Sequence, residues 1–175
     1  MSARAVHRLR CACGEVECAG YGAPIGTAVC YCDDCQAAAR AIEALPGAVP
    51  VADPDGGTAL TLFDTRNFAV VRGEDKLVAH RLGDTSPTRR MVAGCCNSAM
   101  FLTFDRGPYW VSTMRNRFTG PLPAIEFRQM TKYRANDLPW PDAAPRSRGF
   151  APRFILRVTV AGVARQFRRR ATIAA

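Results

Sequence analysis

Seven of the eight cysteines lie in three short clusters, and thiols clustered in this way are typical zinc ligands. The clusters are Cys11-Ala-Cys13-Gly14, Cys30-Tyr-Cys32-Asp-Asp-Cys35 and Gly94-Cys95-Cys96-Asn97. Zinc in proteins favours about four ligands in a tetrahedron, with zinc–sulfur distances of about 2.3 Å. The first residues lack the apolar run of a signal peptide, so we expect a cytoplasmic protein, whose thiols stay reduced. The pattern therefore predicts metal binding rather than disulfides.

The middle cluster has the spacing of an open metal site. Cys30 and Cys32 close a short expected strand over residues 27–29, and Cys35 falls in the first turn of an expected helix over residues 33–45, which Asp33 could cap. A helix N-terminus lowers the pKa of a thiol and favours the thiolate. Three sulfurs with a fourth position left open are typical of a catalytic zinc. In the alternative interpretation, Cys18 supplies a fourth thiolate and the site is structural.

The first and third clusters together predict a second site. Cys11 and Cys13 are two residues apart, so in an extended segment both side chains point to one side. Cys95 and Cys96 are adjacent and can reach one metal only from a turn, which the flanking glycine and asparagine favour. We expect these four cysteines to hold one structural zinc. The alternative is that only three of them ligate and Cys95 packs as a small apolar residue.

Hydrophobic periodicity predicts a mainly β fold. The expected strands are a strand–turn–strand unit over residues 6–18 and runs at 58–63, 68–71, 77–82, 89–93, 99–104 and 109–113. One short helix follows the middle cysteine motif, and a second helix is expected from Arg153 to Arg170. Its apolar face is expected to contain Phe154, Val158 and Phe167, together with Ile155 and Val163.

Charge and proline content divide the chain into three parts. We expect a zinc-binding β domain over residues 1–135, a linker over 136–152 that contains four prolines, and a basic C-terminal helix or tail over 153–175. Residues 1–142 carry 16 basic and 15 acidic side chains, whereas residues 143–175 carry eight arginines and no acidic residue. This asymmetry favours an acidic partner for the C-terminal part, either nucleic acid or an anionic surface. No segment is long and apolar enough to cross a membrane.

The order of the cysteine motifs, over about residues 8–115, resembles the glutathione-dependent formaldehyde-activating enzyme family, which includes centromere protein V. The resemblance implies a β-tent of antiparallel sheets organised by zinc. It also implies a structural zinc on Cys11, Cys13 and Cys96, and a second, catalytic zinc on Cys30, Cys32 and Cys35. The implied activity is that of a carbon–sulfur lyase, which joins a formaldehyde-like carbonyl to a thiol such as glutathione.

The sequence departs from the family pattern in two places. Relatives usually have C-x-x-C-G-[ST]-P in the late turn, so aligning Cys96 with the second cysteine places Ala93 where the first belongs. Cys95 must then take that place through a shifted turn, and the chain is closer to a subgroup with tandem cysteines. Asp33 and Asp34 put negative charge beside the middle cluster, which disfavours an anionic thiol such as glutathione.

Two functions follow from these residues. The first is an enzyme that uses the Cys30, Cys32 and Cys35 site on a small thiol or carbonyl substrate. The second is a non-catalytic, zinc-folded binding module whose arginine-rich C-terminus contacts nucleic acid or an anionic surface. His7 and His80 are the only histidines, and we expect both to be surface or strand residues rather than bases. Arg40, which lies beyond Cys35 on the expected helix, is a candidate contact for a substrate carboxylate. The oligomeric state stays open.

Overall fold

The computed structural model describes residues 5–134 and 136–167, which fold into two β-sheets and two α-helices. The strands are β1 (Val6–Arg10), β2 (Glu17–Tyr21), β3 (Gly26–Cys30), β4 (Thr58–Asp64), β5 (Phe68–Arg72), β6 (Leu77–His80), β7 (Thr88–Ala93), β8 (Ser98–Phe104), β9 (Trp110–Met114) and β10 (Phe127–Gln129). The helices are α1 (Asp33–Glu43) and α2 (Pro152–Phe167). Short 3₁₀ turns span η1 (Thr65–Asn67), η2 (Glu74–Lys76), η3 (Arg115–Arg117) and η4 (Thr131–Tyr133).

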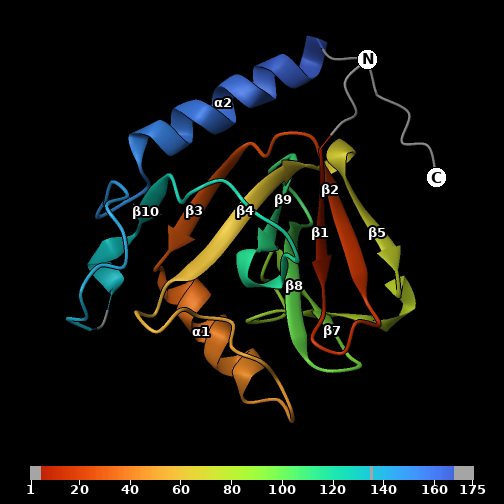
Figure 1. Cartoon of the computed structure of the whole chain (residues 1–175). Coiled ribbons are helices and arrows are strands. Elements are labelled where there is room, and N and C mark those ends of the chain that lie inside the picture. The colour runs from red at the N-terminus through yellow and green to blue at the C-terminus, as the bar shows by residue number, and fades with distance from the viewer. Residues whose placement is uncertain (1–4, 135, 168–175) are drawn as a thin grey trace.

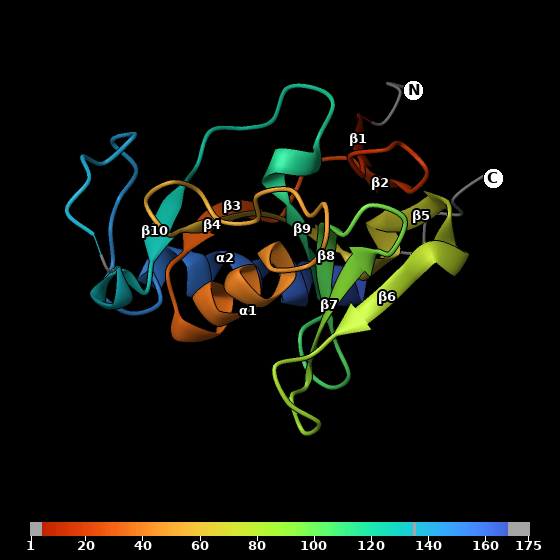
Figure 2. The same cartoon turned by 90° about the horizontal axis from the view of Figure 1, so that it is seen from below.

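The two sheets lean together in the shape of a tent. The smaller sheet has the strand order β1-β2-β5, and the larger has the order β10-β3-β4-β9-β8-β7-β6. Figure 1 shows the sheets converging at the top and separating below, with α2 across the top and α1 at the lower opening. Side chains of both helices, Ala39 and Ile42 of α1 and Phe154 and Val158 of α2, join one apolar cluster with Leu60 and Leu62 of the larger sheet, and Figure 2 shows both helices on one side of β3 and β4. This arrangement confirms the predicted mainly β fold with one short helix and one C-terminal helix.

Apolar side chains fill the space between the layers. The helix α1 packs through Ala38, Ala39 and Ile42, whose spacing places them on one helical face. A second cluster between the two sheets joins the hairpin of β1 and β2 to the strands β7, β8 and β9. Its buried members are Leu9, Cys11, Val16, Cys18, Ala93, Met100, Phe101 and Val111. Cysteines 11 and 18 are therefore part of the packing that holds the two sheets together.

The strand β10 was not predicted from the sequence. It has only three residues, and two of them, Arg128 and Gln129, are polar side chains that are nonetheless buried. It pairs with β3 in parallel, which places Gln129 beside Cys30. All the pairs among the strands β1 to β9 are antiparallel. Short runs without apolar alternation lack the signal on which strand prediction depends.

Burial of Arg128 is tolerated because all three nitrogens of its guanidinium donate hydrogen bonds. It forms ion pairs with Asp55 at 3.2 Å and Asp142 at 2.9 Å, and it donates a hydrogen bond to the hydroxyl of Tyr31. That hydroxyl donates in turn to Asp55 at 2.6 Å. Trp140 lies under the guanidinium of Arg128, with 5.8 Å from the ring centroid. This network connects β10 to the residue between Cys30 and Cys32.

Residues 136–151 form neither a helix nor one of the named strands, and Pro152 is already the first residue of α2. The backbone of this segment is hydrogen-bonded to β10. The N–H of Arg128 donates to the carbonyl of Pro145, and the N–H of Ser147 donates to the carbonyl of Arg128. The division of the chain into a domain, a linker and a tail stays a prediction.

The helix α2 is attached along its inner side. Phe154 and Val158 are its buried residues, while Arg157 pairs with Glu126 at 2.7 Å and Arg165 with Asp64 at 3.4 Å. The expected apolar face is corrected for three of its residues, because Ile155, Val163 and Phe167 are 47%, 53% and 83% exposed. Within residues 5–134 and 136–167, neither helix has the length and hydropathy that a membrane span requires.

We predict that Arg128→Met lowers the free energy of unfolding by about 3–5 kcal/mol, because it removes the closer of the two cations of the buried Asp55 carboxylate, leaving only Arg134 at 4.0 Å. Urea denaturation monitored by circular dichroism measures this loss. The matched control is Arg81→Met, which removes an exposed pair with Asp105 and should cost less than about 1 kcal/mol. Equal losses in the two variants would contradict the structural role of Arg128.

Candidate metal centres

The first thiol cluster contains the sulfurs of Cys11, Cys13, Cys95 and Cys96, all within 4.8 Å of one another. The Sγ of Cys13 lies 3.3 Å from that of Cys95, and the Sγ of Cys11 lies 3.6 Å from that of Cys13 and 3.9 Å from that of Cys95. Sulfurs at the corners of a zinc tetrahedron are about 3.8 Å apart, given a zinc–sulfur distance of about 2.3 Å. The donor set and its spacing therefore fit a metal ion that prefers four thiolates.

Two turns from opposite sheets build this cluster. After β1, the N–H of Gly14 donates to the carbonyl of Cys11 at 3.0 Å, and Gly14 has a φ of 80°, which glycine adopts at no steric cost. The N–H of Val16 donates to the Sγ of Cys11 at 3.2 Å. Between β7 and β8, Asn97 has a φ of 51°, and the N–H of Cys96 donates to the carbonyl of Ala93 at 3.2 Å. This late turn brings both adjacent cysteines to one point.

A serine links the two turns. The hydroxyl of Ser98 accepts a hydrogen bond from the N–H of Ala12 at 3.0 Å and lies 3.1 Å from the Sγ of Cys96. Burial alone would raise the pKa of Cys96, but hydrogen bonds from Ser98 and Cys13 outweigh it and lower the pKa to about 6. Burial raises the pKa of Cys11. Ser98 was not singled out in the sequence, because a serine after a turn carries no distinctive signal.

The second thiol cluster contains the sulfurs of Cys30, Cys32 and Cys35, again within 4.8 Å of one another. Cys30 is the last residue of β3 and is buried, Cys32 is the N-cap residue of α1, and Cys35 lies in the first turn of that helix. The expected helix is confirmed, but its cap is Cys32 rather than Asp33. The end of a buried strand and the start of a helix thus supply all three sulfurs.

One sulfur of this cluster accepts hydrogen bonds from the other two. Contacts with the thiols of Cys30 and Cys35 lower the pKa of Cys32 to about 2, with smaller contributions from backbone N–H groups at the start of α1. The hydrogen bond to Cys32 raises the pKa of Cys30 to about 12, and contacts with Cys30 and Cys32 raise the pKa of Cys35. A metal ion held by these sulfurs would displace the protons of the thiols that are not ionised.

Buried polar side chains surround the second cluster. Cys30 pairs in register with Thr58 on one side and with Gln129 on the other, and the Oγ1 of Thr58 and Oε1 of Gln129 are buried without a hydrogen-bond partner. The buried Arg90 donates through Nη2 to the carbonyl of Asp34 at 3.2 Å, while its Nη1 has no partner. Such unpartnered groups are uncommon in folded proteins and often mark a site for water or a ligand.

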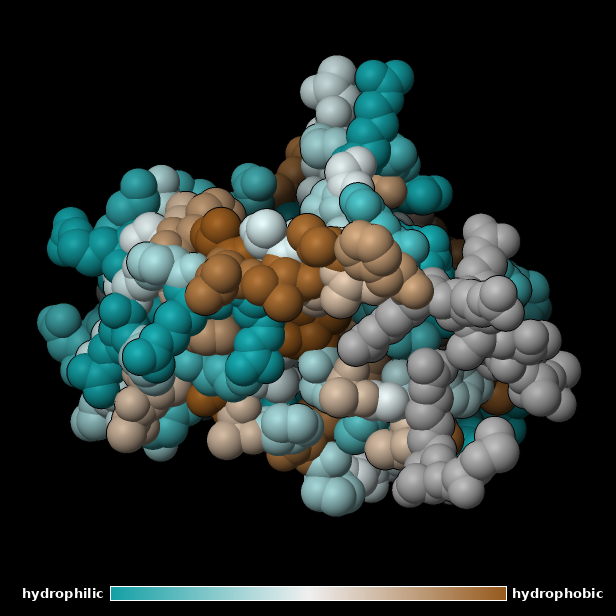
Figure 3. Space-filling view, turned by 90° about the horizontal axis from the view of Figure 1, so that it is seen from above, coloured by the Kyte–Doolittle hydropathy of each residue, from teal (hydrophilic) through white to brown (hydrophobic). Residues whose placement is uncertain are grey.

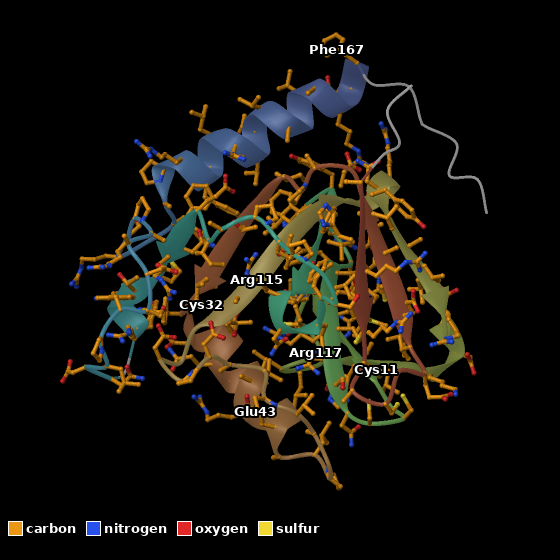
Figure 4. All side chains as sticks on the ribbon, in the orientation of Figure 1. Cys11, Cys32, Glu43, Arg115, Arg117 and Phe167 are labelled. Carbon is orange, nitrogen blue, oxygen red and sulfur yellow. The ribbon has the colours of Figure 1, made fainter. Side chains whose placement is uncertain are left out.

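Two arginines of η3 lie between the thiol clusters in the view of Figure 4, which labels Arg115, Arg117, Cys32 and Cys11. Burial lowers the pKa of Arg117, and the nearby sulfurs of Cys96 and Cys11 act in the opposite direction. Burial also lowers the pKa of Arg115, whose Nη1 has no hydrogen-bond partner. The sequence did not single out either arginine, because only the tertiary structure brings η3 to this place.

Several residues considered in the sequence lie outside both clusters. Cys18 is 0% exposed on β2, and burial raises its pKa to about 12. Its sulfur belongs to neither of the two groups found among the described residues, so the interpretation in which it seals the second cluster is wrong. The ring centroid of His7 lies 5.7 Å from that of Phe63. His80 is half-buried on β6, and Arg40 is exposed on α1.

Comparison with known proteins identifies a family for most of the chain. The family model described as glutathione-dependent formaldehyde-activating enzyme matches residues 6–116. The sequence matches none of the curated proteins with which it was compared. Among solved structures, a crystal structure of a Rhodobacter sphaeroides protein shares 18% identity over 66% of this chain and 91% of that chain, with a TM-score of 0.47. That likeness is too distant to support an inference about function.

The two clusters predict different effects for two buried cysteines. Cys18→Ala should keep the full metal content of the protein, because its sulfur belongs to neither cluster, while Cys11→Ala should lose one metal ion per chain. Elemental analysis of protein purified under reducing conditions measures both. Loss of metal from Cys18→Ala, with unchanged circular dichroism, would contradict the assignment of the sulfurs.

Proposed function

The chain belongs to the glutathione-dependent formaldehyde-activating enzyme family, and from that membership we propose that it is a zinc enzyme that joins a formaldehyde-like carbonyl to a small thiol. The observation that carries the proposal is a cluster of three sulfurs, Cys30, Cys32 and Cys35, with no fourth cysteine beside it among the described residues. Three protein ligands and one free position are the pattern of a catalytic zinc site.

We propose that Cys11, Cys13, Cys95 and Cys96 hold a structural zinc. Four sulfurs complete a tetrahedral site and leave no position for a substrate. The ligands come from turns of different sheets, so binding a metal there would contribute directly to the free energy of folding. The late turn lacks the C-x-x-C spacing of the family, because Ala93 stands where the first cysteine belongs. The distance of 3.3 Å between the sulfurs of Cys95 and Cys13 supports the proposal that Cys95 replaces that cysteine as a ligand.

We propose that Cys30, Cys32 and Cys35 hold the catalytic zinc. A zinc ion in such a site supplies a Lewis acid that favours the ionised form of a bound thiol at neutral pH or polarises a carbonyl. The chain itself orients the three sulfurs: Cys30 is held in the β3 ladder, and the first turn of α1 holds Cys32 and Cys35. Gln36 fixes that turn, because its side-chain nitrogen donates to the carbonyls of Tyr31 and Tyr133 at 2.7 Å each.

The proposed reaction is an addition without any change in oxidation state. The thiol sulfur forms a bond to the carbonyl carbon while the carbon–oxygen π bond breaks, and the proton lost by the thiol ends on the carbonyl oxygen. The product is a hydroxymethyl thioether when the carbonyl is formaldehyde. The reverse reaction breaks the same carbon–sulfur bond, which is why the activity is described as that of a carbon–sulfur lyase. A reducing compartment such as the cytoplasm would supply both thiols and a reduced site.

We propose that the thiol substrate carries no net negative charge. Asp33 and Asp34 are exposed in the first turn of α1, beside the ligands Cys32 and Cys35. Glutathione is anionic at neutral pH, and like charges near the site disfavour its approach. The buried Arg90 lies at the same turn but is turned toward the carbonyl of Asp34, so its charge offsets this repulsion only in part.

The alternative function, a binding module without turnover, has less support. In that interpretation Cys18 could complete the second cluster and make both sites structural, but the sulfur of Cys18 belongs to neither cluster. Its arginine-rich C-terminus includes Arg157 and Arg165, which are paired with acidic side chains of the sheet region, and Arg168, Arg169 and Arg170, which lie outside the described residues. Nucleic-acid binding by this end of the chain stays a prediction.

Counting zinc by native mass spectrometry tests the two sites. We expect two zinc ions per chain in the wild-type protein, and one in Cys32→Ala, because that change removes a ligand of the second site alone. Circular dichroism should show that Cys32→Ala remains folded. A wild-type protein that holds a single zinc, unaffected by Cys32→Ala, would remove the basis for the proposed enzyme.

Adduct formation tests the proposed activity. We expect the wild-type protein, but not Cys32→Ala, to accelerate the addition of ¹³C-formaldehyde to cysteamine or 2-mercaptoethanol, as followed by nuclear magnetic resonance. Cys18→Ala serves as the matched control and should retain the rate. No acceleration with any thiol by a protein that holds two zinc ions would contradict the reaction while leaving the metal sites intact.

Substrate charge is tested by Asp33→Asn/Asp34→Asn. Removing the two negative charges should raise the rate with glutathione relative to 2-mercaptoethanol by roughly two- to fivefold, the size expected for screened charges near a protein surface. An unchanged ratio would show that these carboxylates do not select the thiol.

A further inference from the structure

The outer face of α2 carries an apolar stripe that the described part of the chain leaves mostly exposed. Leu156, Val160, Val163 and Phe167 follow one another at intervals of four, three and four residues, so they lie along one side of the helix. Their exposed fractions are 64%, 58%, 53% and 83%. Figure 3, which looks down on this face, shows a brown band of hydrophobic residues across the top of the molecule.

Attachment of α2 to the sheets does not need this stripe. The buried residues Phe154 and Val158 lie on the opposite side, and the rings of Trp110 and Phe127 stand 6.4 Å and 6.1 Å from that of Phe154. The hydroxyl of Tyr109 donates to the carbonyl of Val158. Four large apolar side chains in water are therefore not explained by the packing of this chain.

The charged residues of α2 and of the segment just before it are all arginines. Arg153 precedes Leu156 by three residues and is exposed, and Arg148 is exposed just before the helix. From residue 143 to the end of the sequence there are eight arginines and no acidic residue. An apolar helical face bordered by arginines is the pattern of a helix that lies in the interface of an anionic membrane.

A second copy of the chain fits this face less well. Sixteen residues give a helix about 24 Å long, and a face about 10 Å wide along it offers about 250 Å², whereas a stable interface buries about 800 Å² on each partner. Pairing two such helices would also bring arginines against arginines. The stripe is equally unsuited to nucleic acid, because phosphates contact basic and polar groups rather than exposed leucine, valine and phenylalanine.

We propose that α2 docks this protein onto anionic lipid bilayers. Leu156, Val160, Val163 and Phe167 enter the boundary between headgroups and acyl chains, and Arg148 and Arg153 contact the acidic headgroups. Because α2 lies across the top of the tent (Figure 1), it can lie parallel to a flat surface, while α1 and the second thiol cluster at the start of that helix face away from the membrane. This docking is independent of the proposed zinc chemistry.

Vesicle flotation with the full-length protein tests the proposal. We expect the protein to float with phosphatidylcholine vesicles that contain about 30% phosphatidylglycerol and to bind pure phosphatidylcholine at least tenfold more weakly. Raising the salt concentration should weaken binding severalfold. Arg153→Gln should reduce the affinity for the anionic vesicles about fivefold, which corresponds to the contribution of one arginine near such a surface.

The decisive variant is Val160→Gln/Val163→Gln, which should lose at least tenfold in affinity for the anionic vesicles. Glutamine has a higher helix propensity than valine, so unfolding of α2 would not be the cause, and circular dichroism and zinc content should stay unchanged. The matched control is Val6→Gln/Val71→Gln, because these valines on β1 and β5 are 48% and 49% exposed. The control should bind as the wild-type protein does.

Four results would overturn the proposal. The first is the absence of flotation with any vesicle, and the second is equal flotation of both double variants. The third is a dimer, detected by light scattering in the absence of lipid, that Val160→Gln/Val163→Gln dissociates, since the stripe would then be covered by a second copy. Binding to duplex DNA that depends on the arginines and excludes vesicles would equally assign this face to another partner.

Discussion

Four sulfur atoms from opposite sheets must meet at one point, and much of the tent depends on this constraint. The turn after β1 supplies Cys11 and Cys13, and the turn between β7 and β8 supplies Cys95 and Cys96, more than 80 residues later. The same hairpins contribute Leu9, Val16 and Ala93 to the apolar cluster between the sheets. If the proposed zinc binds there, it adds a second link between two sheets that already contact each other through apolar side chains. Its binding free energy would then contribute to the free energy of folding, because the ligands come from segments far apart in the sequence.

The second thiol cluster depends on a different part of the larger sheet. Cys30 ends the buried strand β3, and its neighbours in the ladder, Thr58 and Gln129, present polar atoms without partners inside the molecule. Tyr31, between two of the cysteines, is held by Asp55 and Arg128. The three sulfurs are thus positioned by strand pairing and a buried ionic network. A rigid cluster with unused polar groups beside it is a suitable setting for the proposed chemistry, because preorganised groups need not be rearranged as charge develops.

The helix α2 has two apolar faces with different roles. The inner face, with Phe154 and Val158, packs on the sheets, and ion pairs from Arg157 and Arg165 fix its position. The described part of the chain leaves the outer face mostly exposed. Since α1 and the labelled Cys32 lie at the lower end of the tent and α2 lies across its top (Figures 1 and 4), a protein docked through this helix would keep the proposed active site accessible to soluble substrates.

The sequence by itself determined the local units: the cysteine clusters, the strands from β1 to β9, the helix that follows Cys32, and a C-terminal helix. These follow from the spacing of residues that are close in the chain, and spacing also indicated that adjacent Cys95 and Cys96 need a turn. Tertiary structure alone decided that Cys18 belongs to the core and to neither cluster, since its distance to other sulfurs depends on strand register. It also decided that β10 exists, because a buried arginine is tolerated only where Asp55 and Asp142 meet it. Likewise, both faces of α2 are apolar in the sequence, and only packing against the sheets decides which one is left in water.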